Sequence, residues 1–191
     1  GSILAGIEAV ILSVEWGVEH GGGDKVDEEA ALFLGQCMAD MSHTWGQWIQ
    51  SVLSMVTYGW YFGEIVYKQR LGANPGKNRA ASTHDDGRVA WRKFADRLQD
   101  SLVRWEFDDT GGVQALVQAP APNYKEIIIP IERGILVRTS RRGNNPEGRS
   151  ALRNVYRPYI FKKNLEWIEG VGVERDLAGI PVIRPPVGVK V

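Results

Sequence analysis

Cysteine and histidine are scarce in this sequence. Its 191 residues include one cysteine, Cys37, and three histidines. One cysteine cannot form a disulfide within the chain, which suits a reducing compartment, and Cys37 is expected to be a small buried apolar side chain. His20, His43 and His84 are far apart and lack the spacing of metal ligands, so the sequence predicts no metal site and no cofactor.

Long apolar runs and an excess of either charge are also lacking. The apolar stretch over residues 3–13 is too short to span a bilayer and is interrupted by Glu8. It has neither the charged start nor the cleavage site of a signal peptide, so we expect no membrane association. The 23 basic and 23 acidic residues cancel, which argues against a dedicated nucleic-acid binder but allows a protein that merely surrounds DNA.

What is present is the composition of a soluble globular protein. Hydrophobic residues make up 43% of the chain and charged residues 24%. The length suits one domain, or one domain with an appendage. The first part of the chain has helical periodicity, the middle has strand periodicity, and the last part is helical again, which together define an α+β fold.

The N-terminal third is predicted to be mainly helical. Apolar residues recur with the helical period over residues 3–13, 27–41 and 45–58. Ser42 or Thr44 is expected to cap the third helix, and Gly59 is expected to end it. Strict apolar–polar alternation over residues 14–20 predicts a short half-buried strand between the first two helices.

The middle of the chain is rich in β-branched and aromatic residues. Strand-like runs occupy residues 60–70, 88–94, 101–107, 113–119, 126–131 and 134–140. Polar turn-forming residues over 71–88 predict a loop or an exposed flap. Asp108 to Gly112 predict the turn of a β-hairpin, and the close succession of strands predicts an antiparallel sheet.

Residues 143–150, GNNPEGRS, are one substitution away from the phosphate-binding loop G-x-x-x-x-G-K-[ST]. The mechanical parts of that loop are missing, since Pro146 removes one N–H and Glu147 places a carboxylate where the anion would lie. Arg149 replaces the lysine, and its planar fork is not equivalent to a compact ammonium group. We therefore expect a turn that starts a helix with Ser150 as N-cap, and keep a P-loop-like nucleotide-binding enzyme as an alternative.

The last helical pattern runs from about residue 150 to 176 and has polarised charges. Its basic half contains Arg149, Arg153, Arg157, Lys162 and Lys163, and its acidic half contains Glu166, Glu169, Glu174 and Asp176. The three arginines recur every four residues, which predicts one basic stripe. This order opposes the helix dipole and therefore indicates outside partners, either acidic protein surfaces or DNA phosphates. A solvated face that is polarised by chance remains the alternative.

Three residues are expected to shape this last helix. Pro158 should kink or divide it, because proline lacks the N–H that would bond the Asn154 carbonyl. Gly170 and Gly172 weaken the second half but allow another helix to approach closely.

Several segments of the chain are similar to a known family. Residues 145–182 resemble the hallmark block of a family of tailed-bacteriophage portal proteins. Residues 58–68, 86–118 and 129–140 also match, so the resemblance covers nearly the whole chain in the family's order. A resemblance of this length is far more specific than any short motif above.

The resemblance implies a non-enzymatic subunit of the portal, or head–tail connector, at one capsid vertex of the virion, assembled in the host cytoplasm. In that family the subunits form a ring, commonly dodecameric. Double-stranded DNA enters non-specifically through its channel, driven by a separate terminase, and later leaves into the tail. Capsid or scaffold proteins and head–tail adaptors are the other implied partners. A monomeric protein-interaction module remains an alternative.

The resemblance also implies how the chain is divided. Residues 1–147 would be a wing, residues 148–177 a stem helix, and residues 178–191 the start of a clip where terminase and adaptors dock. The rest of the clip, a second stem helix and a crown are expected to be missing. Lys162 and Lys163 are expected to face DNA, and Gly170 and Gly172 to allow close helix packing. Subunit-interface ion pairs are expected from Arg149, Arg153, Arg157, Glu166, Glu169, Glu174 and Asp176.

Overall fold

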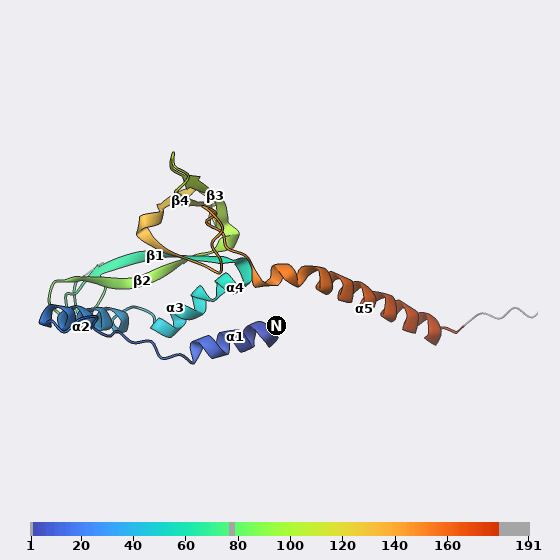
Figure 1. Cartoon of the computed structure of the whole chain (residues 1–191), viewed down its shortest axis with the longest axis horizontal. Helices are drawn as coiled ribbons and strands as arrows, with labels where there is room; N and C mark the ends of the chain where they lie inside the picture. The colour runs from blue at the N-terminus through green and yellow to red at the C-terminus, as the bar shows by residue number, and fades with distance from the viewer. Residues whose placement is uncertain (1, 77–78, 180–191) are drawn as a thin grey trace, which may run out of the picture. The chain divides into compact units, whose positions relative to one another are not determined.

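Helices, antiparallel sheets and a final long helix follow one another along the chain, which confirms the α+β prediction (Figure 1). The structure is a computed structural model and describes residues 2–76 and 79–179. The chain divides into two units, Gly1–Ala151 and Leu152–Val191, and each is described by itself.

The predicted N-terminal helices are present, although the third is divided in two. The helices are α1 (Ser2–Leu12), α2 (Lys25–Ala39), α3 (Trp45–Val52) and α4 (Ser54–Tyr58). Of the two proposed caps it is Thr44 that begins α3, because its hydroxyl accepts from the Gln47 backbone N–H at 3.2 Å. The Gln47 side chain accepts in return from the Thr44 N–H at 2.9 Å, which completes a capping box. Gly59 ends α4 in the left-handed conformation, as predicted.

The predicted strand over residues 14–20 is wrong. These residues connect α1 to α2 and form no strand. Val14 and Trp16 are each about half exposed, at 51% and 53%. Alternation produces a strand only where a neighbouring strand supplies hydrogen bonds, and within the described chain no strand pairs with this segment.

The first sheet carries the helices on one face. It contains β1 (Trp60–Gln69), β2 (Val89–Arg97) and β6 (Gly134–Arg138), in the antiparallel order β2-β1-β6. Figure 1 shows α2 and α3 along one side of this sheet. The core between them is made of Trp48, Ile49, Val52, Tyr61 and Phe94.

The second sheet lies on the other side of β1 (Figure 1). It contains β3 (Leu102–Phe107), β4 (Val113–Gln118) and β5 (Ile127–Pro130), in the order β3-β4-β5. The predicted hairpin is the β3–β4 pair. Short 3-10 turns, η1 (Gln99–Ser101) and η2 (Ile131–Arg133), flank the sheet. Its core is made of Trp60, Phe62, Leu116 and Ile129.

Strand β1 joins the two cores because successive side chains of a strand point to opposite faces. Tyr61 packs against the helices, whereas Trp60 and Phe62 pack against the second sheet. The Trp60 ring meets the Trp105 ring edge-on at a centroid distance of 5.0 Å. The aromatic run at the start of β1 therefore holds the first unit together.

A four-residue 3-10 turn, η3 (Ala151–Asn154), begins at the last residue of the first unit and precedes the long helix α5 (Tyr156–Leu177) of the second unit. The helix thus begins at residue 156 rather than near 150, and its N-cap is Val155 rather than Ser150. The predicted division occurs just before Pro158, which lies in the first turn of α5, where a missing N–H costs nothing. Most of the segment expected to begin a clip, residues 180–191, lies outside the described residues.

This helix boundary changes the basic stripe. Arg157 lies in the first turn of α5, but Arg153 lies in η3 and Arg149 precedes both elements. The prediction that the three arginines form one stripe on one helix is therefore wrong. A stripe needs an uninterrupted 3.6-residue repeat, and the 3-10 turn breaks it.

Candidate functional site

The segment that resembles a phosphate-binding loop packs against the start of β1. A Cβ on Gly148 would lie 2.2 Å from the Gly59 carbonyl oxygen and 2.8 Å from the Thr139 hydroxyl. The Thr139 hydroxyl accepts from the Arg149 N–H at 3.0 Å, and the Thr139 N–H donates to the Gly59 carbonyl at 3.0 Å. A side chain at position 148 would therefore clash with the backbone. The Arg149 N–H, a donor that a bound phosphate would use, already donates to Thr139.

The other side of this loop is also held by protein groups. The Trp105 indole N–H donates to the Glu147 carboxylate at 3.2 Å. The Asn145 side chain accepts from the Glu147 N–H at 3.0 Å, and its carbonyl accepts from the Arg138 guanidinium at 2.7 Å. The loop is followed by the 3-10 turn η3 instead of the α-helix whose N-terminus would face a phosphate. The geometry therefore favours a structural role, in which this loop closes the first unit, and disfavours a nucleotide site.

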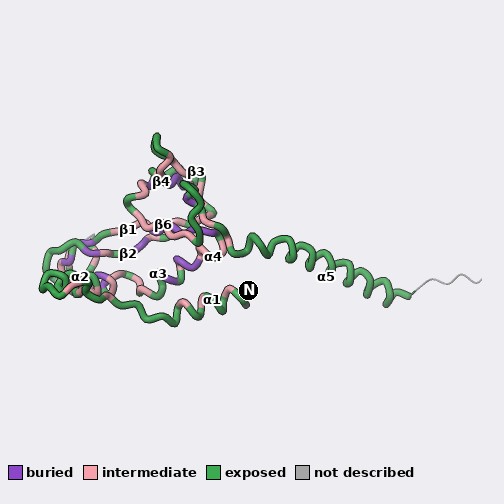
Figure 2. Tube along the Cα trace, viewed as in Figure 1, coloured by how far each residue is buried: buried purple, intermediate pink, exposed green. Residues whose placement is uncertain are grey.

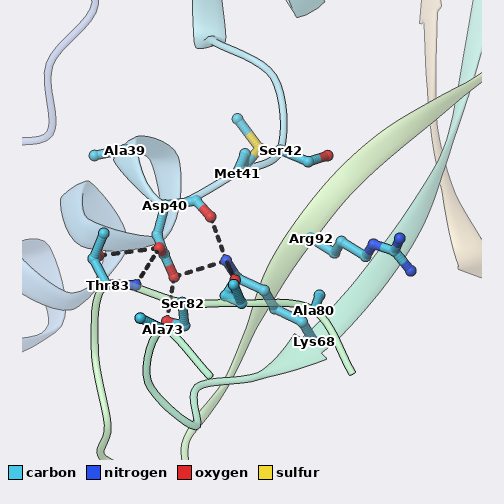
Figure 3. A pocket seen from close by; sticks show the side chains of 11 residues that line it. Ala39, Asp40, Met41, Ser42, Lys68, Ala73, Ala80, Ser82, Thr83 and Arg92 are labelled. Atoms are coloured by element: carbon cyan, nitrogen blue, oxygen red, sulfur yellow. Dashed lines mark hydrogen bonds and ion pairs between the residues drawn. The ribbon is translucent and has the colours of Figure 1, made fainter. Parts of the chain in front are cut away.

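A buried ion pair lies where α2 meets the loop between β1 and β2 (Figure 3). The Lys68 ammonium lies 2.9 Å from the Asp40 carboxylate, and both side chains are about 95% buried. Lys68 also donates to the Ala81 carbonyl at 2.8 Å. The Asp40 carboxylate accepts from the Ser82 hydroxyl at 2.6 Å and from the Thr83 N–H at 2.9 Å. Every oxygen of the carboxylate is thus hydrogen-bonded.

These contacts set the ionisation of Asp40. Burial by itself raises the pKa of the carboxyl group. Hydrogen bonds from Ser82, Thr83 and Lys68 outweigh that effect and hold the pKa of Asp40 well below its usual value. The charge is therefore permanent at neutral pH and is neutralised by Lys68.

The contacts of Ala81, Ser82 and Thr83 therefore hold the second half of the predicted loop over residues 71–88 in place. An open cleft of about 550 Å³ adjoins the ion pair, bordered by Met41, Ala73 and Arg92 (Figure 3). Asp40 and Lys68 pair with each other, so we interpret this cleft as the place where α2, β1 and the loop meet rather than as a ligand site. The sequence pattern did not reveal this pair. Alternation along a strand normally identifies its inward-facing residues, but a bulge between Val66 and Tyr67 shifts the alternation before it reaches Lys68.

A second buried cation strengthens the same seam. Arg70 is 2% exposed and donates to the Gln36 side chain at 2.8 Å. It pairs with Asp86 at 3.1 Å and lies over the Phe33 ring at 5.1 Å. Cys37 lies nearby and is buried, as predicted, and burial raises the pKa of its thiol. Helix α2 is thereby fixed to the end of β1 by side chains that the sequence pattern did not single out.

Helix α5 has a different character, because every one of its residues is exposed (Figure 2). Its large apolar side chains are Tyr156, Tyr159, Ile160, Phe161, Leu165, Trp167, Ile168, Val171, Val173 and Leu177. Gly170 and Gly172 have open space beside them, because a Cβ on either glycine would meet no neighbouring atom of the described chain within 4 Å. A helix of this kind is stabilised mainly by tertiary packing, so its surface is the second candidate site.

The candidate charged residues of α5 are only partly brought together. Lys162 and Glu166 form an exposed pair one turn apart, with a nitrogen–oxygen distance of 3.4 Å. Such a pair contributes about 0.3–0.5 kcal/mol. Glu169, Glu174 and Asp176 also lie on α5, and its first turn contains no acidic residue, as the polarised pattern predicted.

Comparison with known families decides the identity of the chain. The model of the family described as "Portal protein of Mu bacteriophage" matches residues 1–166. The chain belongs to this portal protein family. The match covers the first unit and the first half of α5, so it confirms the resemblance found in the sequence. No curated protein matches the chain.

Portal family membership gives the chain a broad role. The family is structural, and its members are components of the virion that assemble into oligomeric rings. Across residues 2–76 and 79–179, no helix is both long enough and apolar enough to cross a membrane. In that same part of the chain, no three His, Cys, Asp or Glu residues are grouped so as to hold a metal ion.

Proposed function

We propose that this portal protein is one subunit of a ring at a single capsid vertex, through which DNA is packaged and later ejected. Residues 1–147 would form the wing, α5 the stem helix beside the channel, and residues 178–191 the start of a clip that docks terminase and adaptor proteins. Capsid or scaffold proteins would hold the ring in the shell. The family match supports the portal assignment. The exposed apolar surface of α5 is the observation that supports the ring.

Helix α5 has apolar side chains on three sides: two ridges, A and B, and a third group made of Tyr159, Val173 and Leu177. Ridge A contains Tyr156, Ile160, Trp167 and Val171. Ridge B contains Phe161, Leu165, Ile168 and Gly172. At 3.6 residues per turn the centres of the two ridges lie about 120° apart around the helix. A helix that is apolar on several sides needs more than one neighbour, and a closed ring of identical subunits supplies two neighbours to every copy.

The charge of the chain suits a channel through which DNA slides. Strong phosphate binding would slow translocation, and the net charge of zero avoids it. Lys162 and Lys163 were the sequence candidates for facing DNA. Consecutive helical residues point about 100° apart, so both lysines cannot point at the channel axis.

Imaging of the complete gene product by negative-stain electron microscopy, together with native mass spectrometry, tests the proposal. The expected result is rings with a central hole and a mass that is a whole multiple of the subunit mass. Monomers at high protein concentration would overturn the proposal and favour the interaction module instead. Glu166→Gln provides a control variant that should still form rings, because it leaves both apolar ridges unchanged.

A further inference from the structure

We infer that the polar stripe between the two ridges of α5, made of Arg157, Asn164 and Arg175, faces the axis of the ring. This inference rests on the proposed ring and goes beyond it, because it assigns the DNA-facing side of the helix. It also moves that side away from Lys162 and Lys163.

The stripe is narrow and lies midway between the ridges. Arg157, Asn164 and Arg175 point within about 20° of one another, because they are separated by seven and eleven residues along the helix. The ridges lie about 60° to either side of the stripe. The rest of the circumference is wider and carries Lys162, Glu166, Glu169 and Asp176 together with the apolar Tyr159, Val173 and Leu177.

Ring closure distinguishes the two sides. In a closed ring of similarly oriented helices, each helix contacts one neighbour on either side. Measured around the helix, the angle between these two contacts is less than 180° on the side that faces the ring axis. On α5 ridges A and B are separated by about 120° across the arginine stripe and by about 240° across the rest of the circumference. When these two ridges contact neighbours, the stripe faces inward. Of the arcs between apolar groups on α5, the stripe is also the one that has arginines and no carboxylate, which suits a side that faces DNA.

The occupant of each ridge is a second copy of α5, and the two ridges are complementary in shape. Ridge A carries the largest side chain of the helix, Trp167, whereas ridge B carries Gly172 with open space around it. An offset of five residues, about 7.5 Å along the helix, places Trp167 of one copy over Gly172 of the next. Helices that are tilted in a ring meet their neighbours with an offset of this kind.

The same offset is complementary in charge. Lys163 lies at the outer edge of ridge A and Glu169 at the outer edge of ridge B, six residues further along. The offset therefore places the ammonium of one copy beside the carboxylate of the next. Lys163 then contributes to the subunit interface, and Lys162 is already paired with Glu166 within its own helix.

The inward stripe would form two rings of positive charge with a neutral level between them. Arg157 and Arg175 are eighteen residues apart, which corresponds to about 27 Å of helix, and Asn164 lies between them. Guanidinium groups bind phosphates without reading bases, so DNA contacts would be weak, non-specific and sensitive to salt.

Engineered disulfides test the neighbour contact in the complete gene product. In a Cys37→Ser background, the pair Trp167→Cys and Gly172→Cys should give a ladder of covalent oligomers on oxidation. The control pair Glu166→Cys and Val173→Cys lies on the side away from both ridges and should stay at least tenfold less cross-linked. Absence of rings overturns the proposed function itself, whereas rings without the ladder overturn only this inference.

The direction of the stripe is decided by cryo-electron microscopy of the same rings at side-chain resolution. The expected result places Asn164 closer to the ring axis than Lys162 or Glu166. A ring in which Lys162 or Glu166 lies nearest the axis overturns the inference while leaving the portal assignment intact.

Discussion

Gly148 lies so close to Gly59 that a Cβ on Gly148 would come within 2.2 Å of the Gly59 carbonyl oxygen. The two glycines are 89 positions apart, and their contact joins the end of the first unit to the turn that begins β1. The Thr139 N–H donates to the same Gly59 carbonyl at 3.0 Å, so both Gly148 and Thr139 pack against this carbonyl.

Gly148→Ala should therefore destabilise the protein. The added methyl group meets backbone atoms that cannot rotate away, and overpacking of this kind costs about 1–3 kcal/mol. The free energy of unfolding is measured by urea denaturation. Gly46→Ala in α3 is the control, since no neighbouring atom of the described residues lies within 4 Å of its Cβ position, and it should be neutral or slightly stabilising. Equal stability of the two variants would contradict the close contact.

Lys68→Met should strongly destabilise the first unit. It leaves the buried Asp40 carboxylate without its counter-charge, which costs about 3–5 kcal/mol. Chemical denaturation at pH 7 measures the loss. Arg88→Met is the matched control, because Arg88 pairs with Glu29 at an exposed position and its loss should destabilise the protein far less than that of Lys68.

The lowered pKa of Asp40 predicts a pH dependence. The carboxyl group titrates near 4 in the unfolded chain and lower in the folded chain, so folding favours the charged form. Its contribution to stability is complete above about pH 4 and is lost as the pH falls through the lower folded-state pKa. Asp40→Asn should therefore show a shallower fall in the free energy of unfolding between pH 5 and pH 2 (roughly the titration range). Parallel curves for the two proteins would contradict this role of Asp40.

Ile168→Asp should prevent assembly without unfolding the subunit. It places a carboxylate midway along the length of ridge B, where a neighbouring helix would have to desolvate it. The oligomeric mass is measured by size-exclusion chromatography with light scattering. Because α5 belongs to the second unit, the melting temperature of the first unit should stay within about 2 °C of the parent value. Normal rings from this variant would exclude ridge B as an interface.

Charge reversal distinguishes the two candidate DNA-facing sides. Arg157→Glu with Arg175→Glu should weaken DNA binding by the rings and reduce the slope of log Kd against log salt concentration, because phosphate contacts are lost. Lys162→Glu with Lys163→Glu has the same change in charge and, compared in assembled rings, should affect DNA binding at least fivefold less. The reverse ranking would restore the lysines as the DNA-facing residues.

Local chemistry in the sequence was sufficient to predict most elements of this protein. The strands, the β3–β4 hairpin, the start of α3 and the end of α4 depend on residues within one or two turns, such as the Thr44 cap and the Gly59 stop. The identity of the family was also accessible, because long matching segments preserve their order along the chain.

Only the tertiary structure decided how distant segments meet. The Asp40–Lys68 pair and the Gly148–Gly59 contact join positions far apart, and such contacts leave no period in the sequence. The strand expected over residues 14–20 was wrong because no neighbouring strand pairs with it in the described chain, and the helix expected from Ser150 began at Tyr156 instead. Propensity sets what a segment can form, whereas hydrogen-bond partners and packing from elsewhere in the chain determine what it does form.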